Sequence, residues 1–407
     1  MRRRFQIKRV FIMVIFLSFC NKVYGDDLMS IYKASITNFP SIESFKFRGQ
    51  SIEYNIKALN REKFLNFDGL TDLFRLHTVD LWNYTSGDLN LINTFDIFNK
   101  KGIDIERNKN EIQINNLLTN IEKKNIFTKV TEAYFNFYKN KNILKIHEES
   151  LEWINKNVSL VTKGVENGIF PATDLNRWNI EKLNQLNSIQ TDKLEISKSE
   201  ETLKILSGLS EINIEEILET DSTELKESEF LKNAPEVYVY GLEQQQKMLD
   251  IKSENRSRYP DLQFGNAFVL NHEPASTGNQ YVILANLNFK LFDGGRKYRI
   301  QSNLVMIKSI ESDKKSAERF LMEYFRNKMF EINAQKEMTK NLLTSKDISN
   351  DNLEKLLVGY QKRFIDFTTL LNSFREDIAI KENYINLFVN FNQNYQYLYH
   401  LSKGDIY

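Results

Sequence analysis

Three side chains that can form strong polar interactions lie beside two short breaks between long helical patterns. The first break, Gly164–Leu175 (GVENGIFPATDL), contains the carboxylate of Asp174. The second break, Gly359–Leu370 (GYQKRFIDFTTL), contains the phenol of Tyr360 and the guanidinium of Arg363. Because a carboxylate accepts hydrogen bonds from both kinds of donor, we expect Asp174 to link the two breaks, with Tyr360 or Arg363 as its partner.

Each of these charges also has a simpler interpretation. Asp174 lies where a helix is expected to begin, and the helix macrodipole favours a carboxylate there without any partner. Arg363 is equally consistent with a solvated charge at an exposed turn. Gly168 and Gly359 belong to the turns themselves. The sequence leaves these alternatives open.

No other set of residues indicates catalysis or a metal site. The histidines occur in no HxxH or HExxH pattern; they are His77, His147, His272 and His400. There is no GxSxG motif, no P-loop and no dinucleotide-binding fingerprint. Cys20 is the only cysteine, so disulfide frameworks and cysteine-ligated zinc lack their ligands. We expect a protein that is not an enzyme and needs no cofactor or metal.

The composition favours long helices. Glycine accounts for 15 and proline for 5 of the 407 residues, against usual levels of about 7% and 5%. So few chain breakers disfavour folds with many strands. With 41% apolar and 27% charged residues, the chain is too apolar for disorder and too polar for a bundle of membrane-spanning helices.

Residues 1–25 are predicted to be an export signal peptide. A basic stretch precedes the ten-residue apolar run Val10–Phe19, which is too short for a membrane anchor. The alternative is a lipobox that ends at Cys20, although Phe19 is bulky where a small residue is preferred. The segment holds six cations and no acid, so the net charge of +1 becomes −5 for the remainder. A chain with a negative net charge and no basic block is not expected to bind nucleic acid.

The sequence after residue 25 contains the same order of predicted elements twice. A short alternating run followed by a long helical stretch occurs at Asn93–Gly102 and again at Asn286–Gly295, offset by 194 positions, and the two helical breaks are offset by 195. A nearly constant offset indicates duplication. We expect a first repeat over 26–210, a linker over 211–235 and a second repeat over 236–407, each with a helix, two strands and a long helical hairpin.

Two of the expected helices are very long. A helix of about 60 residues extends about 90 Å, which requires another helix along its length. The first long helix has a coiled-coil seam with steps of three and four residues, formed by Val130, Ala133, Phe137, Asn140, Leu144, His147, Leu151, Ile154, Val158, Val161 and Val165. The second is less regular, with Leu304, Ile307, Phe320, Tyr324, Leu353 and Leu356 as its markers. The expected helices are 29–62, 102–165, 173–207, 236–257, 296–359 and 367–402.

In four stretches, apolar and polar residues alternate as they do in β-strands. These stretches are Leu70–Tyr84, Leu89–Ile97, Leu262–Leu270 and Tyr281–Leu291. About ten residues with one apolar face fit a transmembrane strand, and they also fit an ordinary half-buried strand. Four strands cannot close a barrel within one chain, and lipid does not tolerate open sheet edges. Strands in a membrane would therefore be shared among subunits.

The last of these strands gives the clearest assignment of faces. On the transmembrane interpretation, Leu287, Phe289 and Leu291 face lipid. The alternate residues Asn286, Asn288 and Lys290 then face water.

In combination, these features resemble the TolC-type outer-membrane efflux proteins over about residues 30–404. The resemblance rests on LFDGG at Leu291–Gly295, RYPDL at Arg258–Leu262, GIFPATDL at Gly168–Leu175 and LSG at Leu206–Gly208. It implies a mainly helical fold with a small membrane β-barrel part, in which long coiled-coil hairpins accompany four transmembrane strands per chain in two tandem repeats. It also implies a homotrimer whose shared α/β-barrel continues as a tunnel across the periplasm.

The sequence departs from the family pattern at the second break. Arg363 stands where the family usually has glycine. The family's acidic residues that narrow the periplasmic mouth align with Thr369 and Asn372, which carry no charge. We therefore do not expect a cation-selecting acidic ring, and multivalent cations should block the mouth only weakly.

The resemblance implies a passive exit duct of a tripartite efflux or type I secretion system, in the outer membrane of a Gram-negative-type bacterium and extending into the periplasm. The expected partners are a periplasmic adaptor (membrane fusion protein), an inner-membrane pump and outer-membrane lipid. The two breaks would then be hairpin tips that close the periplasmic mouth at rest. The alternative is a periplasmic coiled-coil adaptor without a pore, which should have one hairpin flanked by glycine-rich β domains. The cargo is not specified by the sequence.

Overall fold

The computed structural model describes residues 27–63, 67–79, 82–214, 224–273 and 276–407. The predicted signal peptide, including Cys20, lies outside these residues. The described residues form, in chain order, α1 (Leu28–Asn38), α2 (Pro40–Glu62), β1 (Phe67–Val79), β2 (Trp82–Phe95), α3 (Lys100–Glu166), α4 (Ala172–Ser207), α5 (Glu227–Lys232), α6 (Pro235–Arg256), β3 (Asp261–Glu273), β4 (Ser276–Asn288), α7 (Arg296–Gln361) and α8 (Phe367–Lys403).

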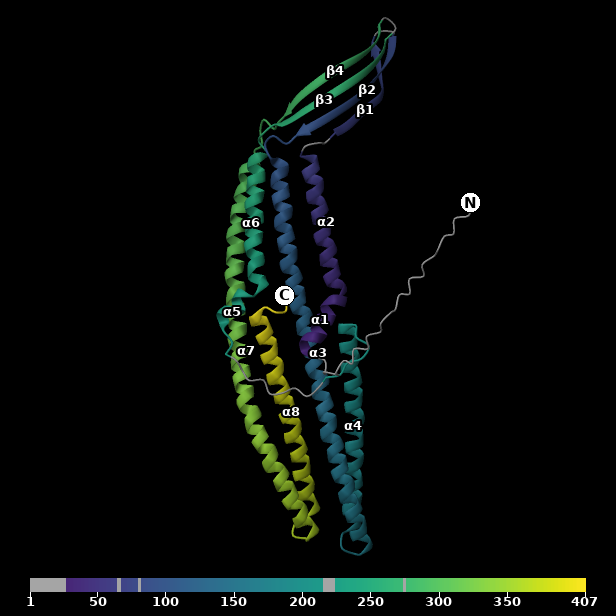
Figure 1. Cartoon of the computed structure of the whole chain (residues 1–407), viewed down its shortest axis with the longest axis vertical. Helices are drawn as coiled ribbons and strands as arrows, with labels where there is room; N and C mark the ends of the chain where they lie inside the picture. The colour runs from purple at the N-terminus through teal and green to yellow at the C-terminus, as the bar shows by residue number, and fades with distance from the viewer. Residues whose placement is uncertain (1–26, 64–66, 80–81, 215–223, 274–275) are drawn as a thin grey trace, which may run out of the picture.

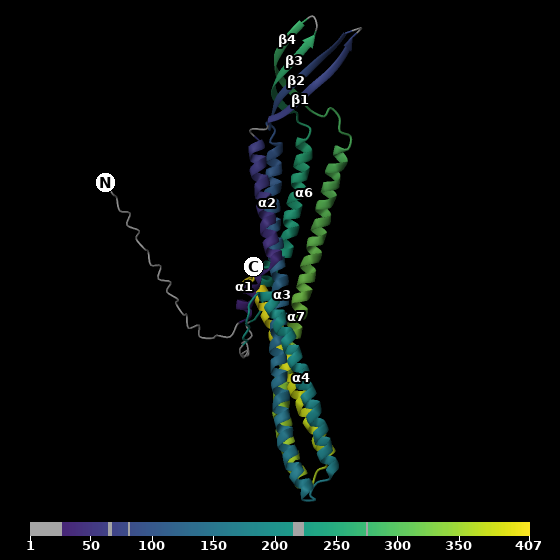
Figure 2. The same ribbon diagram turned by 90° about the vertical axis from the view of Figure 1, so that its right-hand side faces the viewer.

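The elements form an elongated molecule with the sheet at one end and two helical hairpins at the other (Figure 1). Helices α3 and α7 have 67 and 66 residues, about 100 Å each, and run through most of the length. Next to the sheet they are accompanied by α2 and α6, and farther away by α4 and α8 (Figure 2). The short helices α1 and α5 lie near the middle.

The predicted helices are confirmed to within about two residues at most ends, with one correction. The first predicted helix, 29–62, is two helices, because Phe39 is extended between α1 and α2. A residue before proline avoids the helical region, and Pro40 begins α2. The predicted linker, 211–235, includes α5.

The coiled-coil seam predicted for the first long helix is confirmed. Each of its residues, from Val130 to Val165, is buried or half-buried in α3. The markers predicted for the second long helix are wrong in part, because Leu304 and Phe320 are 49% and 70% exposed on α7 and belong to neither apolar core. Tyr324 stacks on the core residue Phe230 (6.4 Å between centroids), and Leu353 is buried.

Two apolar cores hold the helices together. The larger core lies around the middle of the molecule and includes Tyr32 of α1, Phe127 of α3 and Leu398 of α8. The smaller core, near the hairpin tips, includes Trp178 of α4 and Leu370 and Phe374 of α8. Among the described residues, no helix carries an apolar stretch long enough to span a membrane.

The four strands form one antiparallel sheet in the order β1-β2-β3-β4. The central pair joins the two halves of the chain, with Leu91 opposite Asn266 and Phe95 opposite Leu262. Directly paired residues point to the same face. The register therefore places the predicted apolar rows of β2, β3 and β4 on one face, where the exposed side chains include Leu91, Phe95, Phe264, Phe268, Tyr281, Ile283 and Leu287.

The opposite face at this end of the sheet is more polar. Asn286 pairs with Gln263, and Asn288 pairs with Asp261. The predicted strand that extends to Leu291 is too long, because β4 ends at Asn288. Phe289, Lys290 and Leu291 follow the end of the strand.

Some contacts recur at the offset predicted for the two halves. The Asn38 amide donates to the carbonyl oxygen of Ser207 (3.1 Å), and the Asn233 amide donates to that of Ser402 (2.7 Å), a shift of 195 positions for both residues. The helices that end there, α4 and α8, both have a left-handed C-cap glycine. A left-handed conformation at a helix end favours glycine, which has no Cβ to clash.

Candidate functional site at the hairpin tips

The two turns that reverse the chain at the hairpin tips have the same backbone design. In the first turn, the Ile169 N–H donates to the Gly164 carbonyl (2.6 Å), and in the second, the Phe364 N–H donates to the Gly359 carbonyl (2.9 Å). A side chain at Gly359 would bring a Cβ within 2.7 Å of the Ile365 side chain. The turn therefore leaves little room for a side chain at the sequence-predicted Gly359, and the end of the Ile365 side chain would have to shift to admit one.

The two turns also place one residue each in the left-handed region. Gly168 has φ of 69°, and Arg363 has φ of 64°. Glycine adopts this conformation without strain, whereas an L-residue with a side chain pays about 1–2 kcal/mol. The Arg363 guanidinium donates across to the carbonyl oxygen of Gly168 (3.4 Å), so it links its own turn to the equivalent residue of the other turn.

We expect Arg363→Gly to stabilise the second turn locally. The change relieves the left-handed strain and loses only an exposed, long hydrogen bond, so amide exchange over residues 359–367 should slow by about two- to fivefold. Lys362→Gly is the matched control, because Lys362 has φ of −86° and gains nothing from glycine. Faster exchange in the Arg363 variant would show that the contact with Gly168 outweighs the strain.

A buried tyrosine joins the tips through the predicted carboxylate. The Tyr360 hydroxyl at the end of α7 donates to Oδ2 of Asp174 in the first turn of α4 (3.0 Å). Tyr360 is only 4% exposed, and its ring stacks on that of Phe170 (5.0 Å between centroids). Burial, together with the charge of Asp174, raises the pKa of Tyr360, so the phenol keeps the proton that it donates.

Residues of both turns line an open hollow of about 640 Å³ at the tips. Asp174, Tyr360 and Arg363 line it, together with Arg177 and Asp366. Arg177 donates to the Thr368 hydroxyl (3.3 Å) and lies over the Phe367 ring. The hollow therefore contains both signs of charge, contributed by both hairpins.

The two residues predicted to replace an acidic ring lie on α8, apart from the Asp174–Tyr360 pair. The N–H and hydroxyl of Thr369 donate to Asp366 (3.0 and 2.8 Å) and lower the pKa of that carboxyl. Thr369 thus helps to cap the helix. Asn372 is exposed one turn farther along.

Sequence reasoning missed the contacts that support this site. Trp178 is fully buried one turn after Asp174 and packs edge-on against Phe367 (5.2 Å). Glu181, one turn farther, is buried and accepts from the Arg375 guanidinium (2.6 Å), which joins α4 to α8. The four-residue spacing from Asp174 to Trp178 was the available signal, since such residues share a helix face.

The seam histidine forms a second polar link between hairpins. His147 of α3 lies between Asp192 of α4 (Nδ1 to Oδ2, 2.5 Å) and Glu382 of α8 (Nε2 to Oε1, 2.8 Å). The two carboxylates contact different ring nitrogens, so the three groups do not converge on one point. The hydrogen bond with Glu382 is the main cause that raises the pKa of His147, with support from Asp192, although burial opposes it.

This raised pKa predicts that the link weakens as the pH rises. Because the native pKa exceeds the unfolded value of about 6.5, the stabilisation is complete below that pH and is lost as pH rises through the native pKa. The protection of backbone amides in α4 and α8 around residues 192 and 382, expressed as the exchange rate relative to the intrinsic rate at the same pH, should therefore be lower at pH 9 than at pH 6. His147→Gln should abolish this difference, and Glu382→Gln should shift it to lower pH. A pH difference that survives His147→Gln would refute the assignment.

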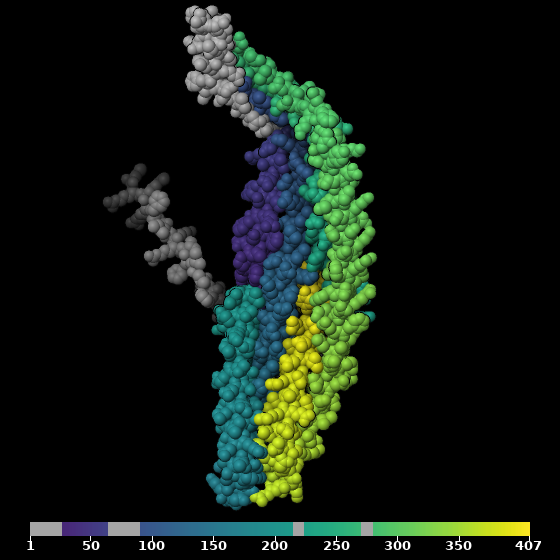
Figure 3. All heavy atoms as spheres, turned by 180° about the vertical axis from the view of Figure 1, so that it is seen from behind, coloured from purple at the N-terminus to yellow at the C-terminus, as the bar shows by residue number. Residues whose placement is uncertain are grey.

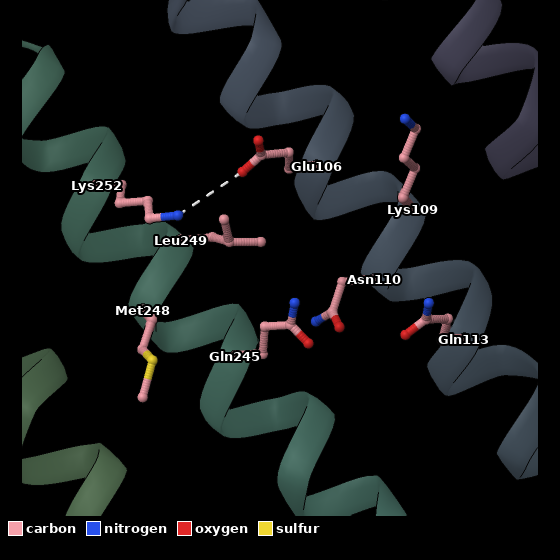
Figure 4. A pocket seen from close by; sticks show the side chains of 8 residues that line it. All are labelled: Glu106, Lys109, Asn110, Gln113, Gln245, Met248, Leu249 and Lys252. Carbon is pink, nitrogen blue, oxygen red and sulfur yellow. Dashed lines mark ion pairs between the residues drawn. The ribbon is translucent and has the colours of Figure 1, made fainter.

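A second hollow, of about 380 Å³, lies between α3 and α6 (Figure 4). Its polar lining consists mainly of amides and of Glu106 and Lys252, which are 4.0 Å apart. The Asn110 amide donates to the Leu242 carbonyl (2.9 Å) and to Gln246 (2.8 Å), which fixes the register of the two helices. In the described part of the chain, no group of three or more His, Cys, Asp or Glu side chains is placed to hold a metal ion.

No family model and no curated protein sequence matches this chain. Solved structures do match it over nearly its whole length. CusC, whose structures concern transmembrane channel formation, has a TM-score of 0.80 at 12% identity, covering 94% of this chain and 95% of CusC. The outer-membrane channel OprN has a TM-score of 0.79 at 13% identity, covering 93% and 90%.

The open state of the outer-membrane channel MtrE of Neisseria gonorrhoeae has a TM-score of 0.75 at 12% identity, covering 93% of this chain and 89% of MtrE. Such low identities leave the arrangement of the elements as the common feature. The chain therefore has the fold of the TolC-type outer-membrane channels, as the resemblance in its sequence predicted.

Proposed function

We propose that the protein is a passive exit duct in the outer membrane of a Gram-negative-type bacterium. The observation that carries the proposal is a sheet with one exposed apolar face, mounted on helices of about 100 Å. Ile283, Tyr281 and Leu287 of β4 are 75%, 66% and 61% exposed on that face. An apolar band of this kind suits contact with lipid.

The open edges of the sheet support a shared barrel. In the described chain, β1 and β4 each pair with one neighbour only, and unpaired edges in lipid are not tolerated. Because β1 follows α2 and β4 precedes α7, each sheet edge continues into one of the outer helices. Pairing of β1 with β4 of the next subunit would close the barrel and align these helices.

Helices on both sides of the molecule, below the β1 edge and below the β4 edge of the sheet, have exposed apolar residues. Helices α2 and α4 lie along one edge of the molecule, and α7 lies along the other (Figure 3). The first edge exposes Phe47, Tyr54, Leu183 and Ile205, and α7 exposes Val305, Phe320, Phe330 and Ile348. Two different apolar edges suit a head-to-tail ring, and three subunits are what the resemblance implies.

Within each subunit, the two halves are best explained as tandem repeats, 26–210 and 236–407 with 211–235 between them. The paired contacts of Asn38 and Asn233 support the duplication, as do the matching turns at Gly168 and Arg363. Asn233 lies within 211–235, so the equivalent of the start of the first repeat falls in that segment. On this basis α5, which falls within 211–235, is the counterpart of the end of α1.

The hairpin tips are proposed to close the periplasmic mouth at rest, with Gly168, Asp174, Gly359, Tyr360 and Arg363 as the gate. The link between Asp174 and Tyr360 supports a closed state, and the open structure of MtrE supports the existence of an open one. Thr369 and Asn372 carry no charge, so blockade by multivalent cations should be weak. A periplasmic adaptor and an inner-membrane pump would supply the opening force and the cargo.

Mass and membrane location test the proposal together. In detergent the purified protein should have three times the mass of one mature chain, and in cells it should be found in the outer membrane as a heat-modifiable trimer. In planar bilayers it should conduct ions. A stable, monodisperse soluble monomer would instead support the alternative of a periplasmic adaptor, which the two long hairpins and the single sheet disfavour.

A further inference from the structure

Cations gather where the helices meet the strands, although the sequence shows no basic block there. Four segments meet at this junction, namely residues 61–63, 96–101, 254–263 and 289–299. Together they contain ten lysines and arginines and five carboxylates, a net charge of +5. We call these segments the collar.

Direct contacts hold the collar together. Lys100 pairs with Asp261 (2.7 Å), and Lys101 pairs with Glu62 (2.9 Å). The Phe98 ring stacks on that of Tyr259 (4.9 Å between centroids). The positive charge is therefore concentrated by the fold at one level of the molecule, rather than spread over flexible ends.

The collar's carboxylates are already engaged. Asp261 and Glu62 accept from the lysines just described. Asp293 and Glu254 both pair with Arg299 (2.6 and 2.9 Å). The remaining carboxylate, Asp96, accepts from the backbone N–H groups at the start of α3.

Several collar arginines have neutral partners instead. Arg256 donates to the backbone carbonyl of Phe98, and Arg296 donates to the Asn255 amide oxygen (3.0 Å). Arg258 lies over the ring of Tyr259 (5.1 Å) and close to its hydroxyl. Arg258, with smaller contributions from Arg256 and Arg296, lowers the pKa of Tyr259, which is the response of a phenol to a positive field.

The collar also contains exposed apolar and aromatic residues. Leu291 and Phe292 are 90% and 89% exposed, and Tyr298 is 72% exposed. Arg258 and Lys297 are exposed at the same junction, and within the described residues neither forms an ion pair with a carboxylate. Cations beside exposed aromatic residues are typical of the boundary between lipid tails and headgroups.

We propose that the collar binds the phosphate groups of anionic phospholipids in the membrane leaflet that faces the helices, with Arg258 and Lys297 as the contacting cations. The inference rests on the proposed function, because the strands must lie in a bilayer for the collar to reach its surface. The lipid would thus fix the depth at which the barrel sits.

Lipid binding to the purified full-length trimer tests this proposal. Native mass spectrometry should show phosphatidylglycerol bound at least about tenfold more tightly than phosphatidylcholine with the same chains, since each cation near the surface favours anionic lipid severalfold. Arg258→Gln combined with Lys297→Gln should remove most of this preference. The matched control, Lys129→Gln with Lys193→Gln, removes two exposed charges far from the sheet and should leave the preference unchanged.

Three results would overturn this inference alone, and a fourth would overturn it together with the proposed function. Equal binding of the two lipids by the wild-type trimer would show that the collar has no preference for anionic lipid. A full preference in the collar variant would place the binding elsewhere. Dissociation of the collar variant into monomers in either lipid would place these cations at the subunit interface. A wild-type protein that formed no trimer and no channel would refute the proposed function, and this inference with it.

Discussion

Replacing Ile283 with arginine should nearly abolish the folded trimer in the outer membrane. Ile283 lies midway along β4 on the apolar face of the sheet and is 75% exposed in the single chain. An arginine that faces lipid near the bilayer midplane costs about 2–4 kcal/mol, and a ring of three subunits carries the cost three times. The amount of heat-modifiable trimer in outer-membrane fractions, at equal total expression, measures the effect.

Leu284→Arg is the control for this prediction. Leu284 follows Ile283 on the same strand, and because strand residues alternate, its side chain lies on the opposite face, which the proposal assigns to the pore. This variant should assemble nearly as well as the wild type. Phe289→Arg should also be mild, since Phe289 lies beyond the end of β4 and the cost near the interface is only about 0–1 kcal/mol. Equal yields for the Ile283 and Leu284 variants would mean that β4 does not lie in lipid.

Asp174→Ala should raise single-channel conductance at rest. The change removes the acceptor of the Tyr360 hydroxyl (3.0 Å) and leaves that buried phenol without its partner. A hydrogen bond to a charged group contributes about 1.5–3 kcal/mol. Loss of the bond from each of three subunits would shift a closed resting state strongly toward open. Conductance of purified trimers in planar bilayers measures the shift.

Two further variants separate the hydrogen bond from the charge. Tyr360→Phe removes only the donor and keeps the ring that stacks on Phe170, so it should open the channel as well, though less. Glu166→Ala removes an exposed carboxylate from the same tip and should change conductance little. If Asp174→Ala leaves conductance unchanged in channels that insert normally, the gate lies elsewhere. The proposal of a passive exit duct does not depend on this result.

The polar link between the tips was predictable because its residues stand next to breaks in the helical pattern. A break marks a turn, turns at equivalent positions in two repeats reach the same end of the molecule, and Asp174 and Tyr360 are obvious partners at that end. The choice between Tyr360 and Arg363 was not predictable. It depends on the left-handed backbone at Arg363, which directs the guanidinium to the Gly168 carbonyl instead.

Features that depend on how helices are rotated against each other were not predictable. The pairing of Glu181 with Arg375 requires one face of α4 to meet one face of α8, and the sequence of each helix alone does not determine that rotation. The exposed residues Leu304 and Phe320 were assigned to an internal seam because periodicity marks an apolar face without naming the partner that covers it. The collar was missed because its cations come from four segments far apart in the chain.

The central strand pair has a consequence for the order of folding. Thr94 of β2 and Gln263 of β3 are neighbours in the sheet but are 169 positions apart in the chain, and contacts of such long sequence separation form slowly. Residues of the β1–β2 hairpin are synthesised well before those of β3. Until then, β2 offers an unpaired edge next to an apolar face, which is the form of strand most prone to aggregation. On the proposed function, we therefore expect the newly exported first half to need protection from aggregation until the second half arrives and the sheet is complete.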